Sequence, residues 1–302
     1  MSFSIRILGS SSALPTVHRQ TSSQVVMYNA TPYLIDCGEG AQIRMREYSL
    51  SFGRLRNIFI SHIHGDHIFG LFGLLSTFSM LGRKTELNIY CPEKLEQICT
   101  NLFASLDHNL GFQVNYNYLN PDGINHIHSD KNLDVFSFPL VHTKPTWGFL
   151  FREKEKERNI RKDFIEDYNL SIAQIVSLKR GEDAVLDNGS ILKSDEATIL
   201  PPAPKSYVYC SDTLPLKRLA DFAGNVDLLY HEATFMEKDA ELAKLTCHTT
   251  TIQATELAKS ISAKRLVLGH FSTRYPTSEL MTEARSVFPD VIEARDGLEI
   301  EI

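Results

Sequence analysis

Three histidines and one aspartate fall within six consecutive positions, in the stretch Ser61-His62-Ile63-His64-Gly65-Asp66-His67. An apolar run of strand type, residues 57–60, precedes this stretch, and an apolar run long enough for a helix, residues 68–80, follows it. The sequence therefore predicts a tight turn, eased by Gly65, between a strand and a helix. Neutral imidazole nitrogens and carboxylate oxygens are typical zinc ligands. Four such residues together indicate a metal site rather than a solvated polar turn.

The composition fits a globular protein with a large core. The chain has 302 residues, of which 43% are hydrophobic, so it can form two domains or one large α/β sandwich. The net charge of −6 argues against a protein that binds nucleic acid through charge alone. It does not exclude a nucleic-acid enzyme, because bound divalent ions and a local basic patch can reverse the sign of the charge at the site.

The cysteines and the apolar runs bound the class of protein further. The five cysteines are scattered, which predicts neither a disulfide framework nor a thiolate zinc site. Residues 4–8 resemble a strand rather than a signal peptide, and no apolar run reaches the length of a membrane span. We therefore expect a soluble, cytoplasmic protein that does not enter a membrane.

Strands and helices alternate along most of the chain. The expected strands are residues 5–8, 24–28, 33–35, 57–60, 87–90, 112–118, 133–140, 148–151, 207–210, 226–230 and 265–268. The expected helices are residues 41–48, 68–80, 93–106, 250–261 and 278–288. A charged segment from residue 152 to about 195 interrupts the pattern, and His126 and His128 are expected in a solvated loop.

Several expected strands end at a histidine or an aspartate. Ligands carried on loops at strand ends are a common way for a sheet scaffold to build a rigid, open site. Each such residue alone is explained equally well as a buried histidine or a turn aspartate. Together they complete two sets of ligands, which are His62, His64 and His142 for one ion, Asp66, His67 and His270 for a second ion, and Asp212 as a bridge. Each ion would keep open positions, as catalytic sites require.

These residues and several further motifs resemble the ribonuclease Z family of the metallo-β-lactamase superfamily. The matching stretches are residues 34–40, 60–75, Ser211-Asp212-Thr213, His231-Glu232-Ala233-Thr234, Cys247-His248-Thr249 and residues 268–272. The resemblance implies an αββα sandwich over residues 1–302 with a protruding arm at about residues 152–195. It also implies two Zn²⁺ ions per chain, with Mn²⁺ or Fe²⁺ as alternatives, and a homodimer.

The same resemblance implies an activity and roles for four residues. Members of the family are zinc-dependent endoribonucleases that remove the 3′ trailer of precursor tRNA with a water activated by two metal ions. Asp66 is then the expected general base, and His248 is the expected general acid, with its ring oriented by Glu232. Asp36 is expected to hold a ligand histidine in place rather than to bind a metal ion itself.

Two stretches depart from the family pattern and bear on the grip on RNA. The family loop P-x-K-x-R-N is replaced by Pro15-Thr16-Val17-His18-Arg19-Gln20, and the arm has Ile172-Ala173-Gln174 where glycine-proline is expected. Acidic and basic residues alternate along the arm, so a solvated, charge-balanced arm and an RNA-binding arm both stay open. The expected RNA contacts are Arg19, Lys179 and Arg180.

Two other functions stay open at this point. One is a metal-dependent phosphodiesterase of the same fold that acts on other RNA or on small phosphodiesters, which the altered loop and arm would suit. The other is a non-catalytic binding protein with a relic metal site, against which the complete ligand set argues. Lactam and thioester hydrolysis do not explain the pair Glu232 and His248. The sequence leaves open the metal bound in the cell and the cut position relative to C-C-A.

Overall fold

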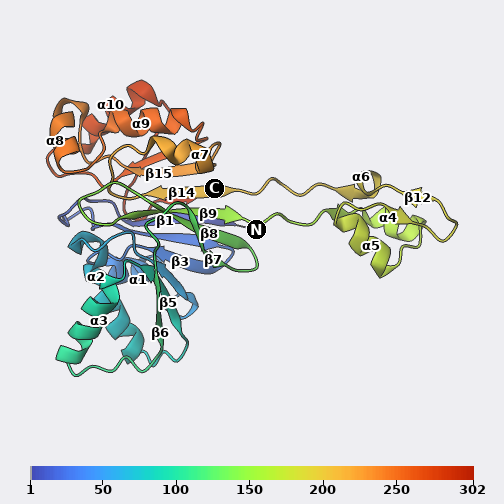
Figure 1. Ribbon diagram of the computed structural model, residues 1–302, viewed down its shortest axis with the longest axis horizontal. Helices are drawn as coiled ribbons and strands as arrows, with labels where there is room; N and C mark the ends of the chain where they lie inside the picture. Colours follow the sequence, from blue (N-terminus) through green and yellow to red (C-terminus); the bar gives the residue numbers. More distant parts are fainter. Residues whose placement is uncertain (1) are drawn as a thin grey trace. The chain divides into compact units, whose positions relative to one another are not determined.

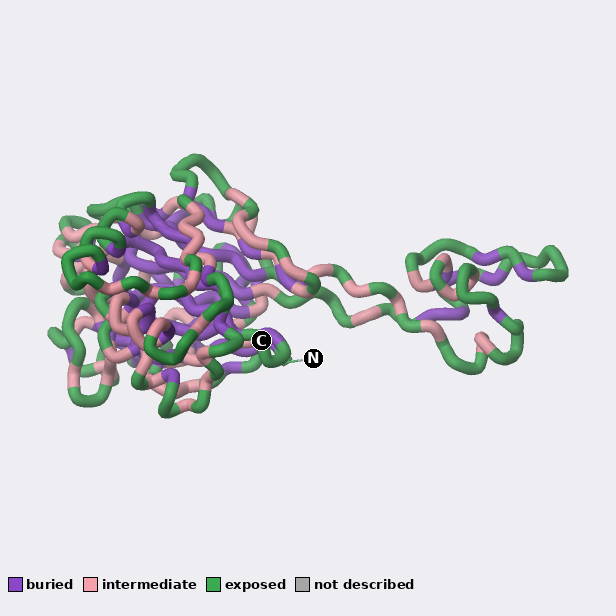
Figure 2. Tube along the Cα trace, turned by 90° about the horizontal axis from the view of Figure 1, so that it is seen from below, coloured by how far each residue is buried: buried purple, intermediate pink, exposed green. Residues whose placement is uncertain are grey.

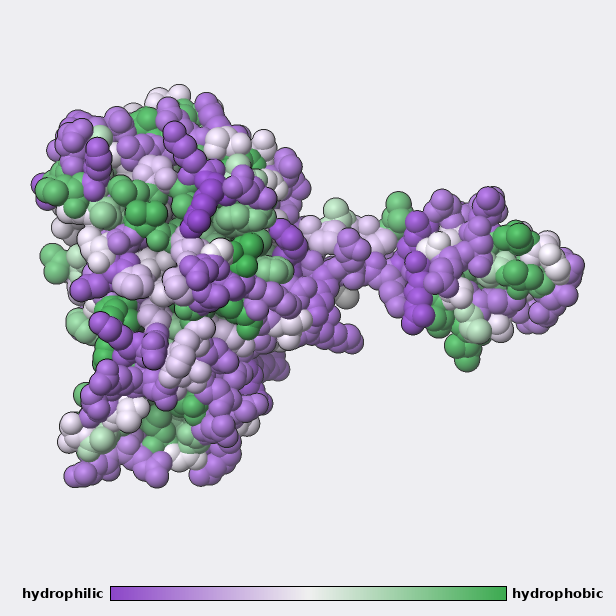
Figure 3. Space-filling model, in the orientation of Figure 1, coloured by the Kyte–Doolittle hydropathy of each residue, from purple (hydrophilic) through white to green (hydrophobic). Residues whose placement is uncertain are grey.

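The computed structural model describes residues 2–302, and these residues form two compact units. The first unit contains residues 2–130, 134–151 and 206–302, and the second contains residues 131–133 and 152–205. Hydrophilic side chains cover most of the surface in Figure 3, with hydrophobic ones gathered in small areas. No helix in the described part of the chain is both long enough and apolar enough to cross a membrane.

Two sheets of seven strands form the centre of the first unit, in the orders β18-β1-β2-β3-β4-β5-β6 and β17-β16-β15-β14-β9-β8-β7. The strands of the first sheet are β1 (Phe3–Gly9), β2 (Ser23–Tyr28), β3 (Thr31–Ile35), β4 (Asn57–Phe59), β5 (Leu87–Cys91), β6 (Val114–Tyr118) and β18 (Glu299–Glu301). The strands of the second sheet are β7 (Asn125–Ser129), β8 (Leu133–Pro139), β9 (Trp147–Glu153), β14 (Ser206–Cys210), β15 (Leu228–Glu232), β16 (Leu266–Gly269) and β17 (Ile292–Glu293).

Helices connect the parallel strands and cover the outer face of each sheet (Figure 1). The first sheet carries α1 (Ala41–Glu47), α2 (Gly65–Met80) and α3 (Lys94–Ser105). The second sheet carries α7 (Ala220–Ala223), α8 (Ala240–Leu245), α9 (Thr251–Ser260) and α10 (Thr277–Val287). Short 3₁₀ turns lie at Phe52–Arg54, Lys217–Leu219 and Glu237–Asp239. This arrangement of two sheets between two layers of helices confirms the predicted αββα sandwich.

Aromatic side chains join the two sheets. The ring of Phe59 on β4 packs edge to face on the rings of Phe149 and Phe151 on β9, with ring centroids 5.5 and 5.4 Å apart. Tyr209 and Tyr230 stack on neighbouring strands of the second sheet with centroids 5.0 Å apart. Figure 2 shows the resulting buried interior of the first unit. Because the two sheets share this core, the loops at their ends are held on a rigid base.

The second unit is small and has its own apolar core. Its elements are β10 (Asn159–Ile160), α4 (Lys162–Asp167), α5 (Ile172–Lys179), β11 (Ala184–Val185), β12 (Ile191–Leu192), α6 (Ser194–Ala197) and β13 (Thr198–Ile199). The buried hydrophobic residues of this core are Leu170, Leu178, Ala184, Leu186, Leu192 and Ala197. Ser171 and Gln174 form a capping box that starts α5. Gln174 therefore has a local structural role at the position where the family pattern has glycine-proline.

Two local predictions are wrong. Helix α2 begins at Gly65, three residues before the expected start at residue 68, so Asp66 and His67 lie in its first turn. The extended backbone of His64 starts this helix, and a carboxylate in the first turn is favourable beside the helix N-terminus. His126 and His128 lie in strand β7 rather than in a loop, because β7 pairs antiparallel with β8.

Candidate metal centre

The predicted ligands all lie at or just after the ends of strands in the first unit. His62 and His64 lie between β4 and α2, and Asp66 and His67 form part of the first turn of α2. The others follow strands of the second sheet, namely His142 after β8, Asp212 after β14 and His270 after β16. The structure brings these side chains together into two groups, which are His62, His64, His142 and Asp212, and Asp66, His67 and His270. Within each group the ligand atoms lie within 4.8 Å of one another, and the same holds for a third group that joins His248 to Asp212 and His270.

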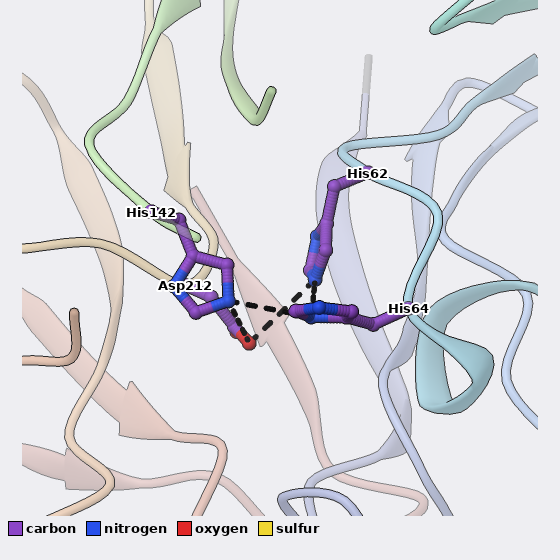
Figure 4. A group of neighbouring side chains, drawn as sticks. All are labelled: His62, His64, His142 and Asp212. Atoms are coloured by element: carbon purple, nitrogen blue, oxygen red, sulfur yellow. Dashed lines mark hydrogen bonds and ion pairs between the residues drawn. The ribbon is translucent and has the colours of Figure 1, made fainter. Parts of the chain in front are cut away.

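The first group contains three imidazoles and one carboxylate (Figure 4). His64 Nδ1 lies 2.9 Å from His62 Nε2 and 3.3 Å from His142 Nε2. Asp212 Oδ2 lies 3.7 Å from His62 Nε2 and 3.8 Å from His142 Nε2. Three nitrogens and one oxygen therefore converge on one point, and imidazole nitrogens and carboxylate oxygens are typical zinc ligands.

The second group uses the other oxygen of the same aspartate. Asp212 Oδ1 lies 3.5 Å from His67 Nε2 and 3.3 Å from His270 Nε2. Asp66 Oδ2 lies 3.6 Å from His67 Nε2 and 3.4 Å from His270 Nε2. Asp212 thus has one oxygen in each group, as a bridging ligand requires.

The protonation of the first group suits metal ligands. Burial, together with the neighbouring imidazoles, lowers the pKa of His62, His64 and His142 below the usual value of histidine. These rings are therefore neutral near pH 7, which is the form that binds a metal ion.

The second group concentrates negative charge around His67. Burial opposes a positive charge on this ring, but the carboxylates of Asp36, Asp66 and Asp212 outweigh burial and raise the pKa of His67. His67 Nε2 and Asp212 Oδ1 are buried and accept or donate no hydrogen bond among the described residues. Unpartnered buried polar atoms call for an explanation. A bound cation would satisfy both atoms, so the residues fit a metal ion.

Asp36 is fully buried and is the acceptor at the centre of a hydrogen-bond network. Its Oδ1 accepts from the Ser61 backbone N–H at 2.7 Å, and its Oδ2 accepts from Ser61 Oγ and Tyr209 Oη at 2.8 Å each. His67 Nδ1 lies 2.8 Å from the same Oδ2. Asp36 therefore fixes the ring of His67 through the nitrogen that faces away from the ligand group.

Glu232 is a second buried carboxylate with a similar arrangement. Its Oε1 accepts from the Thr249 backbone N–H at 2.8 Å and lies 3.0 Å from His248 Nδ1. Its Oε2 accepts from the Thr234 hydroxyl at 2.7 Å, and this hydroxyl oxygen lies 2.9 Å from His270 Nδ1. Burial lowers the pKa of His248, but the charge of Glu232 outweighs burial and raises it to about 9. One carboxylate thus positions both His248 and a candidate ligand.

Sequence reasoning missed several of these supporting groups. Ser61 Oγ lies 3.0 Å from His62 Nδ1, and the backbone oxygen of Cys247 lies 2.9 Å from His142 Nδ1. Ser61 stands directly before the first histidine, so its position was a usable signal. The carbonyl of Cys247 carries no signal in the sequence, because every residue has one. It is aimed by a left-handed backbone at Cys247, with φ of +57°.

None of the three predicted RNA contacts belongs to a ligand group, and two of them, Arg19 and Lys179, form ion pairs within the protein. The guanidinium of Arg19 donates to Ser10 Oγ, to the Ala294 backbone oxygen and to Glu293 Oε1, each at 2.6 Å. In the second unit, Lys179 Nζ lies 3.1 Å from a carboxylate oxygen of Glu157, and Arg180 ends helix α5.

A pocket of about 600 Å³ opens onto both ligand groups. Its lining residues are Ser12, Ala13, His64, Gly65, Asp66, Phe69, His142, Thr143, Asp212, Leu245, Thr246, His248 and His270. Ala13 has a left-handed backbone with φ of +57°, and its N–H donates to Asp66 Oδ2 at 2.9 Å. The pocket therefore combines a candidate metal centre, a carboxylate held by a backbone donor, and an imidazole held by a carboxylate.

Comparison with known proteins places this geometry in a family. The chain is 42% identical to proteins named ribonuclease Z in Phocaeicola vulgatus and Porphyromonas gingivalis, over 99% of this chain and 97% and 99% of theirs. Solved structures with the same fold include the short form of human tRNase Z (24% identity, TM-score 0.71, 98% of both chains covered). A metallo-β-lactamase fold protein of Bacillus subtilis also matches (19% identity, TM-score 0.71, 100% of both chains covered).

A family model covers the first half of the chain as well. Residues 3–169 match the family described as anti-Pycsar protein Apyc1. The solved structures confirm the metallo-β-lactamase fold, and the similarity to the relatives covers 99% of this chain. This chain belongs to the ribonuclease Z family, and its residues 3–169 belong to the domain family described as anti-Pycsar protein Apyc1.

Proposed function

We propose that this protein is a metal-dependent endoribonuclease that removes the 3′ trailer of precursor tRNA. The observation that carries the proposal is the His248–Glu232 pair, 3.0 Å apart, whose histidine lines the same pocket as members of both ligand groups. Cleavage of a phosphodiester needs an activated water, neutralised phosphate oxygens and a protonated leaving oxygen. The pocket holds residues suited to each need, and the relatives named ribonuclease Z support RNA as the substrate.

The proposed cofactor is a pair of Zn²⁺ ions. His62, His64, His142 and Asp212 would hold one ion, and Asp66, His67, His270 and Asp212 the other. When bound, such ions acidify water and neutralise phosphate oxygens. Zinc is favoured by the five imidazoles of the set, and Mn²⁺ or Fe²⁺ would accept the same donors.

Two residues of the chain would transfer protons, and two others would orient histidine rings. The Asp66 carboxylate would act as general base and accept the proton of the attacking water, and the Ala13 N–H holds its Oδ2 in place. His248 is bound to Glu232 through Nδ1, which leaves Nε2 to protonate the leaving ribose oxygen. Glu232 would orient the ring of His248, and Asp36 would orient the ring of His67.

The resemblance to the family supports four further proposals. The chain would be a single metallo-β-lactamase-type domain, residues 1–302, with an arm at about residues 152–195. Lys179 and Arg180 of this arm, and Arg19, are the proposed RNA contacts. The protein would act as a homodimer. Its location would be the cytoplasm, where we expect precursor tRNA to be processed.

A second candidate function is hydrolysis of other RNA or small phosphodiesters. It is favoured by one observation, which is that no lysine or arginine stands among the described residues that line the pocket. A small diester needs no basic surface beyond the metal ions, whereas a long RNA needs phosphate contacts outside the pocket.

The test is cleavage of a precursor tRNA by the purified protein loaded with Zn²⁺ or Mn²⁺, beside the Asp66→Ala protein. One cut close to the discriminator base, absent with Asp66→Ala, is the expected result. Intact RNA together with hydrolysis of bis(p-nitrophenyl) phosphate would instead support the second candidate. No hydrolysis of either substrate by metal-loaded protein would point to a binding protein.

A further inference from the structure

One aromatic side chain is exposed inside the pocket and has no role in the reaction described above. Three aromatic side chains among residues 2–302 are largely exposed, namely Phe69 (62%), Tyr118 (53%) and Tyr168 (46%). Of these three, Phe69 lines the pocket that contains the candidate ligands. A single exposed phenyl ring is ordinary on a protein surface. This ring, however, lines a pocket whose other lining residues are mostly polar, so it offers an apolar surface to a bound substrate.

Helix geometry directs this ring toward the metal ligands. A side chain on an α-helix leans back over the residue four positions earlier, and for Phe69 that residue is Gly65. A Cβ placed on Gly65 would lie 2.3–2.9 Å from atoms of the Phe69 ring. The ring therefore lies against the bare backbone of Gly65, the residue that separates His64 from Asp66 in the sequence. The backbone of Gly65 is not left-handed, so the absence of a Cβ matters here only because it leaves room for the ring.

The ring is also within one helical turn of the proposed general base. Asp66 and Phe69 are three positions apart on α2, so their Cβ atoms lie about 5–6 Å apart. A part of the substrate that is bound against the ring therefore lies next to the phosphate on which Asp66 would act. Leu245, which is 78% exposed at the end of α8, lines the same pocket and adds a second apolar surface.

We propose that the Phe69 ring is a stacking platform for the nucleobase next to the scissile phosphate. This inference rests on the proposed function, because it takes RNA as the substrate. Every nucleobase has a flat π-face, so an aromatic ring binds it without reading its sequence. A platform of this kind would suit an enzyme whose substrates share a shape and differ in the bases around the cut.

The test combines protein variants with altered substrates. Phe69→Ala should lower kcat/KM for precursor tRNA roughly 5- to 150-fold, the equivalent of the 1–3 kcal/mol typical of stacking. Phe69→Trp should keep most of the activity, and Phe69→Leu should not. The matched control is Tyr118→Ala, which removes a similarly exposed aromatic ring outside the pocket and should leave kcat/KM within a factor of about 2, as expected for a surface change of under ~0.5 kcal/mol.

Substrates with an abasic nucleotide on either side of the cut complete the experiment. If the ring stacks on one of these bases, removing that base should slow the wild-type enzyme, and Phe69→Ala should then cost little more. The inference would be overturned if Phe69→Ala lowered kcat/KM by the same factor on the normal substrate and on both abasic substrates. It would also be overturned if Phe69→Ala left kcat/KM on the normal substrate unchanged. If the wild-type protein cleaves no precursor tRNA, the proposed function fails, and this outcome is distinguishable from failure of the stacking site alone.

Discussion

Tyr209 of the second sheet donates a hydrogen bond of 2.8 Å to Asp36, which directly follows strand β3 of the first sheet. Both side chains are buried, and the same oxygen of Asp36 lies 2.8 Å from His67 Nδ1. The hydroxyl of Tyr209 thus connects one sheet to a candidate ligand carried by the other. Because the ligand set draws on both sheets, contacts of this kind fix the separation of the ligands.

Removal of these supporting groups should weaken metal binding. Asp36→Ala should lower the affinity for Zn²⁺ about 10- to 100-fold, as is typical for partners of ligand histidines. Tyr209→Phe removes one hydrogen bond of about 0.5–1.5 kcal/mol and should lower the affinity roughly 2- to 10-fold. Competition with a chromophoric chelator measures both effects.

The control for Tyr209 lies on the same strand. The hydroxyl of Tyr207 donates to Gln24 Oε1 at 2.5 Å and does not contact Asp36. Tyr207→Phe should therefore leave the affinity for Zn²⁺ unchanged. Equal losses of affinity in the Tyr207 and Tyr209 variants would show that the effect is general destabilisation rather than support of His67.

A change at His248 should reduce cleavage without reducing metal binding. His248→Ala removes the proposed acid and should lower kcat about 10²- to 10⁴-fold while the protein still binds two ions per chain. His142→Ala removes a ligand, so it should lose an ion as well as activity. Elemental analysis of dialysed protein beside single-turnover cleavage distinguishes the two. Loss of one ion in His248→Ala would make this residue a ligand instead.

Arg19 is expected to act on stability as well as on RNA. Its ion pair with Glu293 is largely buried, and its guanidinium lies over the ring of Phe271, 5.1 Å from the centroid. Arg19→Ala and Glu293→Ala should each lower the free energy of unfolding by about 1–3 kcal/mol. The double variant should cost less than the sum, because both single changes break the same ion pair. Urea titration measures this.

A salt-dependent rise in KM would reveal the other role of Arg19. If Arg19→Ala weakens RNA binding and leaves the free energy of unfolding unchanged, the side chain binds phosphate and its contacts with Ser10, Ala294 and Glu293 contribute little. We expect the opposite result, in which Arg19→Ala lowers the free energy of unfolding more than it weakens RNA binding.

Gly70 is expected to tolerate no side chain. Its N–H donates to the Cys37 backbone oxygen at 2.9 Å, and a Cβ at this position would lie 2.0 Å from the Gly38 backbone oxygen. Gly70→Ala should therefore force α2 away from the loop after β3 and lower the free energy of unfolding by about 1–3 kcal/mol. Gly53→Ala is the control, since a Cβ on Gly53 would meet no described atom within 4 Å. Equal stability of the two variants would contradict this close packing.

The sequence predicted the structure best where an apolar run lies directly beside metal-ligating residue types. Strand β4 and the cluster from His62 to His67 could be predicted because an apolar run precedes an unusual set of ligands. The start of α2 could not be predicted, because a glycine such as Gly65 is typical of a turn. The sequence does not show that the Phe69 ring packs on this glycine. Residues as distant as Asp66 and His270 could be expected to meet because they lie close to the ends of strands, and the resemblance implied the sandwich that brings these ends together.

Other contacts leave no trace in the sequence. The backbone oxygen of Cys247 and the N–H of Ala13 depend on left-handed backbone at residues other than glycine. Strand β7 was missed because its polar residues lack the alternation of a half-buried strand. Whether the converging residues hold ions stays a prediction for the metal-binding measurements above.

Cleavage of one precursor tRNA through a cycle of metal removal and return tests the central claim most directly. The cut sites would be mapped at single-nucleotide resolution for the protein as purified, after chelation, and after Zn²⁺ is restored, with the bound metal counted at each stage. We expect a single cut next to the discriminator base, lost with the metal and regained with it. Intact RNA with two ions bound per chain would contradict the proposal that this centre processes tRNA.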